Sequence, residues 1–229
     1  MRFEAELREL EARPAEVVRE RVYGGVRVAA EWSDAGVLLE LTGEVDRRDA
    51  PAFVELFFHD AFLLLNLAAP GSFSGTVATR GGPLRVRELT FDARVFVAAG
   101  GERLPLETVV AWYDALDIGT RQLAASAEAI ALFELLHLAR GDEEDEESIL
   151  RLARAAEALL GRPDSLRRLF ALREAIAFGR VPVVHPLHDD VLDPRVADIT
   201  AEWTEVADAA AAAVIGALRQ RILRSAGAA

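Results

Sequence analysis

An apolar stripe near the end of the chain most constrains the fold. From Val196 to Ile222, apolar residues recur at three- and four-residue spacing, which is typical of one face of an α-helix. Asp193 and Pro194 precede the stripe, and these residue types suit an N-cap and a first helical turn. The pattern predicts a helix of roughly 28 residues, about 42 Å long at the helical rise.

Three further helical segments precede this long helix. The same spacing covers about residues 107–138, 149–160 and 166–179. Gly161 and Pro163 end the second segment, and Asp164 or Ser165 can cap the third, which stops at Gly179. Because the connections are short or moderate, the four helices predict an antiparallel four-helix bundle over residues 106–229.

Residues 1–105 follow a different pattern, with alternating apolar residues on either side of a turn. Val26 to Trp32 and Val37 to Leu41 alternate around the turn residues 33–36, which predicts a β-hairpin. Asp49 and Pro51 then open a helix rich in phenylalanine and leucine. This helix is apolar on most faces, so we expect it to be buried.

A second hairpin is predicted downstream of that helix. Its strands are Thr76 to Arg80 and Leu84 to Val97, joined by a turn at residues 81–83. Phe91, Ala93, Val95 and Val97 would then share one face. The sequence therefore predicts the α+β fold class: a small N-terminal α+β domain over residues 1–105, with antiparallel hairpins and a buried helix, followed by the helical bundle.

Composition and charge exclude several functions. The chain has no cysteine, so disulfides, thiolate metal sites and cysteine nucleophiles are absent. Its formal net charge is −12, and all 26 basic residues are arginine. Because nucleic-acid affinity depends on neutralising phosphates, this charge disfavours RNA as a non-specific partner.

The sequence also favours a cytoplasmic location. Residues 1–6 are acidic, whereas a secretory signal begins with a basic segment and an apolar run. The most apolar stretch, residues 61–69, is too short to span a bilayer. We therefore expect a cytoplasmic bacterial protein with no membrane partner and no cofactor.

A short motif closes the third helical segment. Arg173 and Glu174 are followed, after three residues, by Phe178 and Gly179. This arrangement resembles the motif of HEPN domains, in which an arginine, a polar residue, three further residues and a histidine lie late in a four-helix bundle. The resemblance covers about residues 108–224, and Phe178 occupies the histidine position.

The HEPN resemblance implies two possible roles. Members of the family often dimerise and bring arginine–histidine pairs to one cleft for metal-independent RNA cleavage, whereas members without those residues act as partners or regulators. A phenyl ring cannot exchange protons near neutral pH as imidazole does. Phe178 therefore favours a non-catalytic member.

An enzymatic alternative uses residues downstream of the motif. Arg180 and His185 also stand five positions apart, so Arg173, Arg180 and His185 could serve a metal-independent ribonuclease. Pro182 and Pro186 oppose a continuous helix through this pair. In the competing interpretation, Arg180 binds helix carbonyls or an acid, and His185 is an ordinary loop residue.

A metal site is the second enzymatic alternative. His185, His188 and Asp189, followed by two more aspartates, place ligands suited to zinc, manganese or iron within nine residues, and could serve a metal-dependent hydrolase. The prolines interrupt the cluster, and its spacing fits no helical ligand motif. A solvated acidic loop explains the same residues.

Taken together, these patterns favour a non-catalytic HEPN-like binding or regulatory protein. The family resemblance alone suggests a setting in bacterial defence or in toxin–antitoxin-like systems. The alanine-rich run Ala207 to Ala213 permits close helix contact, either within the bundle or in a homodimer. The expected partner is another protein or a second copy of the chain.

Overall fold

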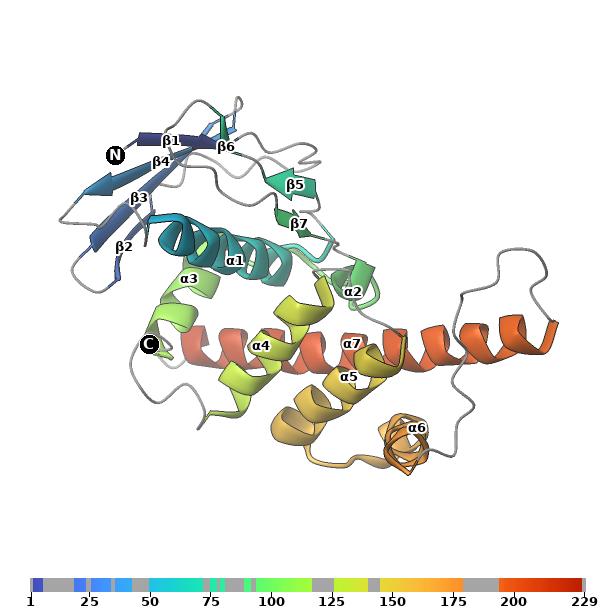
Figure 1. Cartoon of the computed structure of the whole chain (residues 1–229). Coiled ribbons are helices and arrows are strands. Elements are labelled where there is room, and N and C mark those ends of the chain that lie inside the picture. Colours follow the sequence, from blue (N-terminus) through green and yellow to red (C-terminus); the bar gives the residue numbers. More distant parts are fainter. Residues whose placement is uncertain are drawn as a thin grey trace.

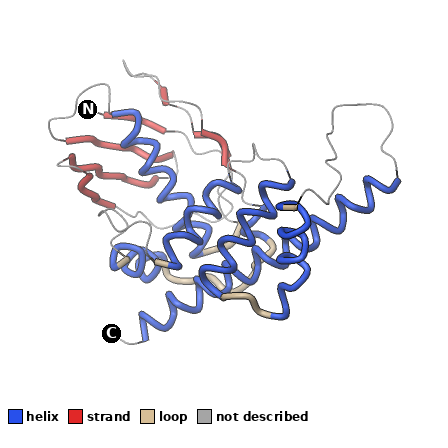
Figure 2. The backbone as a smooth tube through the Cα atoms, turned by 60° about the horizontal axis from the view of Figure 1, so that its bottom comes forward, coloured by secondary structure: helices blue, strands red, loops and turns tan. Residues whose placement is uncertain are grey.

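The computed structural model of the protein describes a helical body and a set of strands beside it. Helices gather in one part of the molecule and strands in another (Figures 1 and 2). The described residues are 2–5, 19–23, 26–33, 36–42, 50–71, 75–77, 79–80, 89–91, 94–116, 126–139, 145–178 and 194–227.

Five strands form the larger sheet, in the order β2-β3-β4-β1-β6 with antiparallel pairing throughout. They are β1 (Arg2–Ala5), β2 (Arg19–Tyr23), β3 (Val26–Ser33), β4 (Gly36–Thr42) and β6 (Thr79–Arg80). Strands β3 and β4 pair from Arg27 opposite Thr42 to Ser33 opposite Gly36. They lie where the alternating pattern predicted the first hairpin.

The predicted second hairpin is present in part, because segments of its two strands pair antiparallel, but its extent was predicted wrongly. Strand β5 (Gly75–Val77) pairs with β7 (Leu89–Phe91), whereas β6 joins β1 in the other sheet. Residues Arg94–Val97 form a short helix, α2, instead of a strand. The helical turn buries Phe96 edge-on against Phe62, with ring centroids 5.6 Å apart, while Val97 is 60% exposed.

The predicted bundle helices are present with different boundaries. The helix expected over 107–138 is two helices, α3 (Leu106–Ala115) and α4 (Ala127–Ala139). Ser126 caps α4, because its Oγ accepts a hydrogen bond from the backbone N–H of Ala129 at 3.0 Å. The other helices are α1 (Ala50–Ala68), α5 (Asp145–Leu160), the 3-10 turn η1 (Asp164–Leu166), α6 (Arg167–Ala177) and α7 (Pro194–Gly227).

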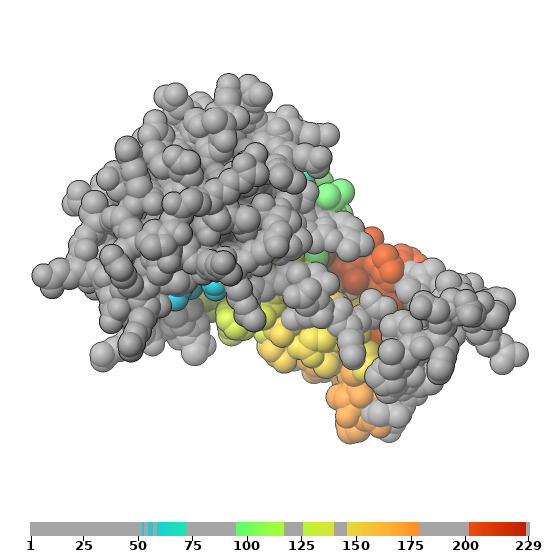
Figure 3. Space-filling view, turned by 45° about the horizontal axis from the view of Figure 1, so that its top comes forward, coloured from blue at the N-terminus to red at the C-terminus, as the bar shows by residue number. Residues whose placement is uncertain are grey.

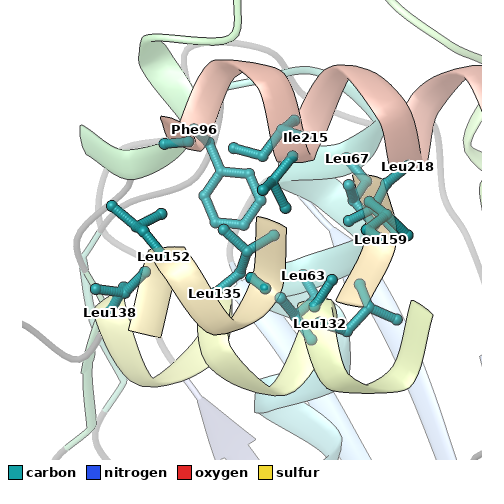
Figure 4. Close-up of a cluster of buried hydrophobic side chains, with 14 of the residues drawn as sticks. Leu63, Leu67, Phe96, Leu132, Leu135, Leu138, Leu152, Leu159, Ile215 and Leu218 are labelled. Carbon is teal, nitrogen blue, oxygen red and sulfur yellow. The ribbon is translucent and has the colours of Figure 1, made fainter. Parts of the chain in front are cut away.

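Among the side chains that the structure describes, the hydrophobic core is helical, and this corrects the predicted α+β class. Of the residues whose side-chain surroundings the structure describes, 85% are helical and none lies in a strand. Leu67 of α1, Leu135 of α4, Leu152 of α5 and Ile215 of α7 share one buried cluster with Phe96 of α2 (Figure 4). Alternation indicates local strand conformation, whereas the fold class depends on which elements supply the core.

One buried arginine joins α7 to the end of α1. Arg219 is 8% exposed, and its guanidinium donates hydrogen bonds to the carbonyl of Leu67, at 3.1 Å, and to that of Glu102. Gly101 has a φ of +105°, which favours glycine, and passes close to this guanidinium. Burial lowers the pKa of Arg219. The last carbonyls of a helix carry partial negative charge, so the end of α1 compensates the buried cation.

A second arginine of α7 makes a similar connection to α4 and α5. Arg221 donates one hydrogen bond to the carboxylate of Glu128, in the first turn of α4. Its Nη2 donates another to the carbonyl of Leu159, in the last turn of α5, at 3.1 Å. Through Arg219 and Arg221, helix α7 therefore donates hydrogen bonds to carbonyls in the last turns of α1 and α5.

We expect Arg219→Met to lower the free energy of unfolding by about 1–3 kcal/mol, because the buried carbonyl of Leu67 and the more exposed carbonyl of Glu102 lose their donor. Denaturant unfolding followed by circular dichroism measures the change. The exposed Arg224 on the same helix is the matched control, and Arg224→Met should change stability by less than about 0.5 kcal/mol. Equal effects of the two substitutions would contradict the assigned role of Arg219.

Candidate functional site

The structure describes the first part of the predicted HEPN-like motif. Arg173 and Glu174 lie on α6, and Phe178 is the C-cap residue of that helix. Arg180 and the predicted metal ligands His185, His188 and Asp189 lie outside the described residues. The arginine–histidine pair and the metal site therefore stay predictions.

Arg173 is bound to a carboxylate of the neighbouring helix. Its Nη1 donates a hydrogen bond to Oε2 of Glu157, on α5, at 2.5 Å, and the Arg173 side chain is 20% exposed. Arg162 donates from Nε to the other oxygen, Oε1, at 2.7 Å. Both guanidinium carbons lie over the ring of Phe170, at 5.4 Å for Arg173 and 5.3 Å for Arg162. We call Glu157, Arg162 and Arg173 the arginine clamp.

The clamp lowers the pKa of Glu157. The hydrogen bond from Arg162 is the largest cause and the hydrogen bond from Arg173 the next, because both favour the ionised carboxylate. The same contact with Glu157 raises the pKa of Arg162. The clamp therefore fixes α6 to α5 through charged hydrogen bonds.

Of the remaining motif residues, Glu174 contacts the clamp and Phe178 follows at the end of α6. Oε1 of Glu174 accepts a hydrogen bond from Nη1 of Arg162 at 3.4 Å. The backbone N–H of Phe178 donates to the carbonyl of Glu174 at 3.0 Å, and the Phe178 side chain is 69% exposed. The position that would carry a histidine in an active HEPN domain therefore presents a phenyl ring at the surface.

A groove of about 690 Å³ lies between α4 and α5, beside the clamp. Its floor is mainly apolar, with Phe133 half exposed. Side chains of α4, α5 and α6 reach the surface next to one another (Figure 3). The described lining residues are Ala129, Ile130, Phe133 and Glu134 of α4, with Arg154, Glu157 and Ala158 of α5.

Glu134 is a buried carboxylate at this groove. Its side chain is 3% exposed, and its two oxygens accept hydrogen bonds from Nη1 of Arg151, at 2.9 Å, and Nη1 of Arg154, at 2.8 Å. Arg151 also pairs with Glu147 at 3.2 Å. A buried charge requires such partners, so these arginines hold α4 against α5.

Phe133 and His137 form an aromatic pair next to the groove. Their ring centroids are 4.2 Å apart. Nδ1 of His137 lies 2.9 Å from the carbonyl oxygen of Phe133, one turn earlier on α4. Because a carbonyl only accepts, Nδ1 is the protonated nitrogen in this contact.

The sequence pattern did not identify the groove or the charged residues that line it. Helical spacing assigned Ile130 to an apolar stripe, and nothing local marks Glu134 as buried. An acid within the apolar run of α4 was the available signal, since a charge at such a position needs partners from another helix.

Comparisons with known proteins found no matching family model, no matching curated protein and no matching solved structure. Within the described ranges, no group of three or more histidine, aspartate or glutamate side chains is placed to hold a metal ion. In that same part of the chain, no helix has the length and apolarity needed to cross a bilayer. The HEPN resemblance therefore stays a prediction.

We expect Glu157→Gln to lower stability at neutral pH by at most about 1 kcal/mol, because the half-exposed carboxylate is screened by water. The folded-state pKa of Glu157 is lowered, so its contribution is complete above the unfolded value and is lost as the pH falls through the folded value. The difference between native and variant protein should therefore shrink below about pH 4.5.

Denaturant unfolding at several pH values tests this expectation. Asp208→Asn, which changes an exposed acid of α7, is the control for loss of a surface charge. A Glu157→Gln effect that stays constant from pH 7 to about pH 3 would rule out the clamp as its cause.

Proposed function

We propose that this chain is a non-catalytic HEPN-like protein that binds or regulates another macromolecule in the bacterial cytoplasm. The observation that carries the proposal is the position of Arg173, whose guanidinium binds Glu157 and lies over Phe170. Phe178 at the expected histidine position supports the same conclusion.

Arg173 has a structural task that competes with catalysis. To stabilise a developing charge on phosphate, the guanidinium would have to leave the carboxylate of Glu157, and Arg162 would then hold that carboxylate alone. A phenyl ring at position 178 cannot accept or donate the protons that RNA cleavage moves. The clamp therefore favours a packing role for the arginine of the motif.

The proposed partner is a protein, either a different chain or a second copy of this one. Within the alanine run of α7, Ala210 and Ala211 are buried in the monomer, whereas Ala209 is exposed. The run therefore serves internal packing first, and a homodimer would use the exposed part of α7. A role in defence or in a toxin–antitoxin-like system belongs to the same proposal and follows from the family resemblance alone.

The proposal predicts that purified protein does not cleave RNA. Labelled single-stranded and structured RNA are incubated with native protein and with His185→Ala, each with and without EDTA. An active ribonuclease on the same substrates is the positive control. We expect the native protein and the variant to leave both RNAs intact.

Two results would contradict the non-catalytic proposal and identify the alternative. Cleavage that survives EDTA and disappears in His185→Ala would establish a metal-independent ribonuclease using Arg173, Arg180 and His185. Cleavage abolished by EDTA would indicate a metal-dependent hydrolase that uses His185, His188 and Asp189.

A further inference from the structure

The groove between α4 and α5 has the size of a small-molecule site. Its volume of about 690 Å³ lies within the range of ligand pockets, and Ile130, Phe133 and Ala158 give it apolar surface. Lining residues span positions 129–134 of α4 and 154–158 of α5, which is about 8 Å and 6 Å of helix at 1.5 Å per residue. A docked amphipathic helix needs anchors over two turns or more, so the short groove favours a small ligand.

The charged residues at the groove favour one sign of charge on that ligand. Both carboxylate oxygens of Glu134 accept hydrogen bonds from arginines, and so do both oxygens of Glu157. A cationic ligand would therefore have to share each of these carboxylate oxygens with a bound guanidinium group.

Arg154, in contrast, can offer hydrogen-bond donors to a ligand. A guanidinium carries five N–H donors, and the hydrogen bond described for Arg154 uses one nitrogen, Nη1, bound to Glu134. Arg154 lines the groove and its side chain is 58% exposed, which leaves the guanidinium accessible from water. Spare donors next to an apolar surface suit an anion that carries an apolar tail.

We propose that the groove binds a small amphipathic carboxylate of the fatty-acid type. The tail packs on Ile130, Phe133 and Ala158, and the carboxylate accepts hydrogen bonds from Arg154. Glu134 holds the Arg154 side chain in place from the buried side. Arg173 contacts the lining residue Glu157, but the proposed ligand contacts use Arg154 and the apolar residues, so the RNA-cleavage result does not decide this proposal.

Isothermal titration calorimetry with decanoate below its micellar concentration tests the proposal. Decylammonium, which has the same tail and the opposite charge, is the matched ligand control. We expect saturable binding of decanoate and binding of decylammonium that is weaker by about tenfold or more, the loss typical of a missing charge-assisted hydrogen bond.

Two substitutions test the two halves of the site. Arg154→Met keeps an apolar stem and should weaken decanoate binding by about tenfold or more. Ala158→Trp fills the groove from α5 and should abolish binding. Because it changes neither Arg154 nor Glu134, this variant tests the site even if Arg154→Met perturbs the buried Glu134. Arg167→Met, at an exposed position of α6 outside the groove, should bind as the native protein does.

Circular dichroism first establishes that each variant keeps the native helix content. The proposal fails if native protein shows no saturable binding of decanoate. It also fails if decylammonium binds equally well, or if a folded Ala158→Trp variant binds decanoate with native affinity.

Discussion

The helical body depends on the burial of one arginine on α7. Arg219 brings a positive charge into the core and places it on the carbonyls of Leu67 and Glu102, which connects α7 to α1 and to the segment that leads into α3. Burying a guanidinium is costly because it loses its water, unless acceptors replace that water. The carbonyls of Leu67 and Glu102 must therefore stay in place for α7 to pack as it does. Helix α7 also packs against α2, α3, α5 and α6, so one long helix organises the rest.

Local signals in the sequence located several helix boundaries correctly. The contacts between residues far apart in the sequence could not be predicted. Pro194 begins α7 and Leu160 ends α5, because proline and glycine act within a single turn. The apolar spacing continued from α3 into α4, so periodicity alone could not separate them. The helical class depends on Phe96 and Leu67 meeting α5 and α7 in one core, which no local pattern encodes.

The candidate site also combines residues that the sequence pattern identified with residues that only helix packing brings together. The motif identified Arg173 and Glu174 from their spacing, but it could not identify Glu157, which lies 16 residues earlier on another helix. Which carboxylate an arginine meets depends on how two helices are rotated against each other. The groove arises from that same packing, so it became visible only with α4 and α5 in place.

The described arginines donate to two kinds of acceptor, carboxylates and backbone carbonyls, and only the carboxylates change with pH. Glu157 can take up a proton, and the charged contacts of the clamp then weaken. The carbonyl oxygens that hold Arg219 do not titrate in that range, so this contact persists when the clamp is lost. Acid strong enough to protonate Glu157, whose pKa is lowered, therefore weakens the contact between α6 and α5, while the carbonyl contacts of Arg219 that join α7 to α1 remain.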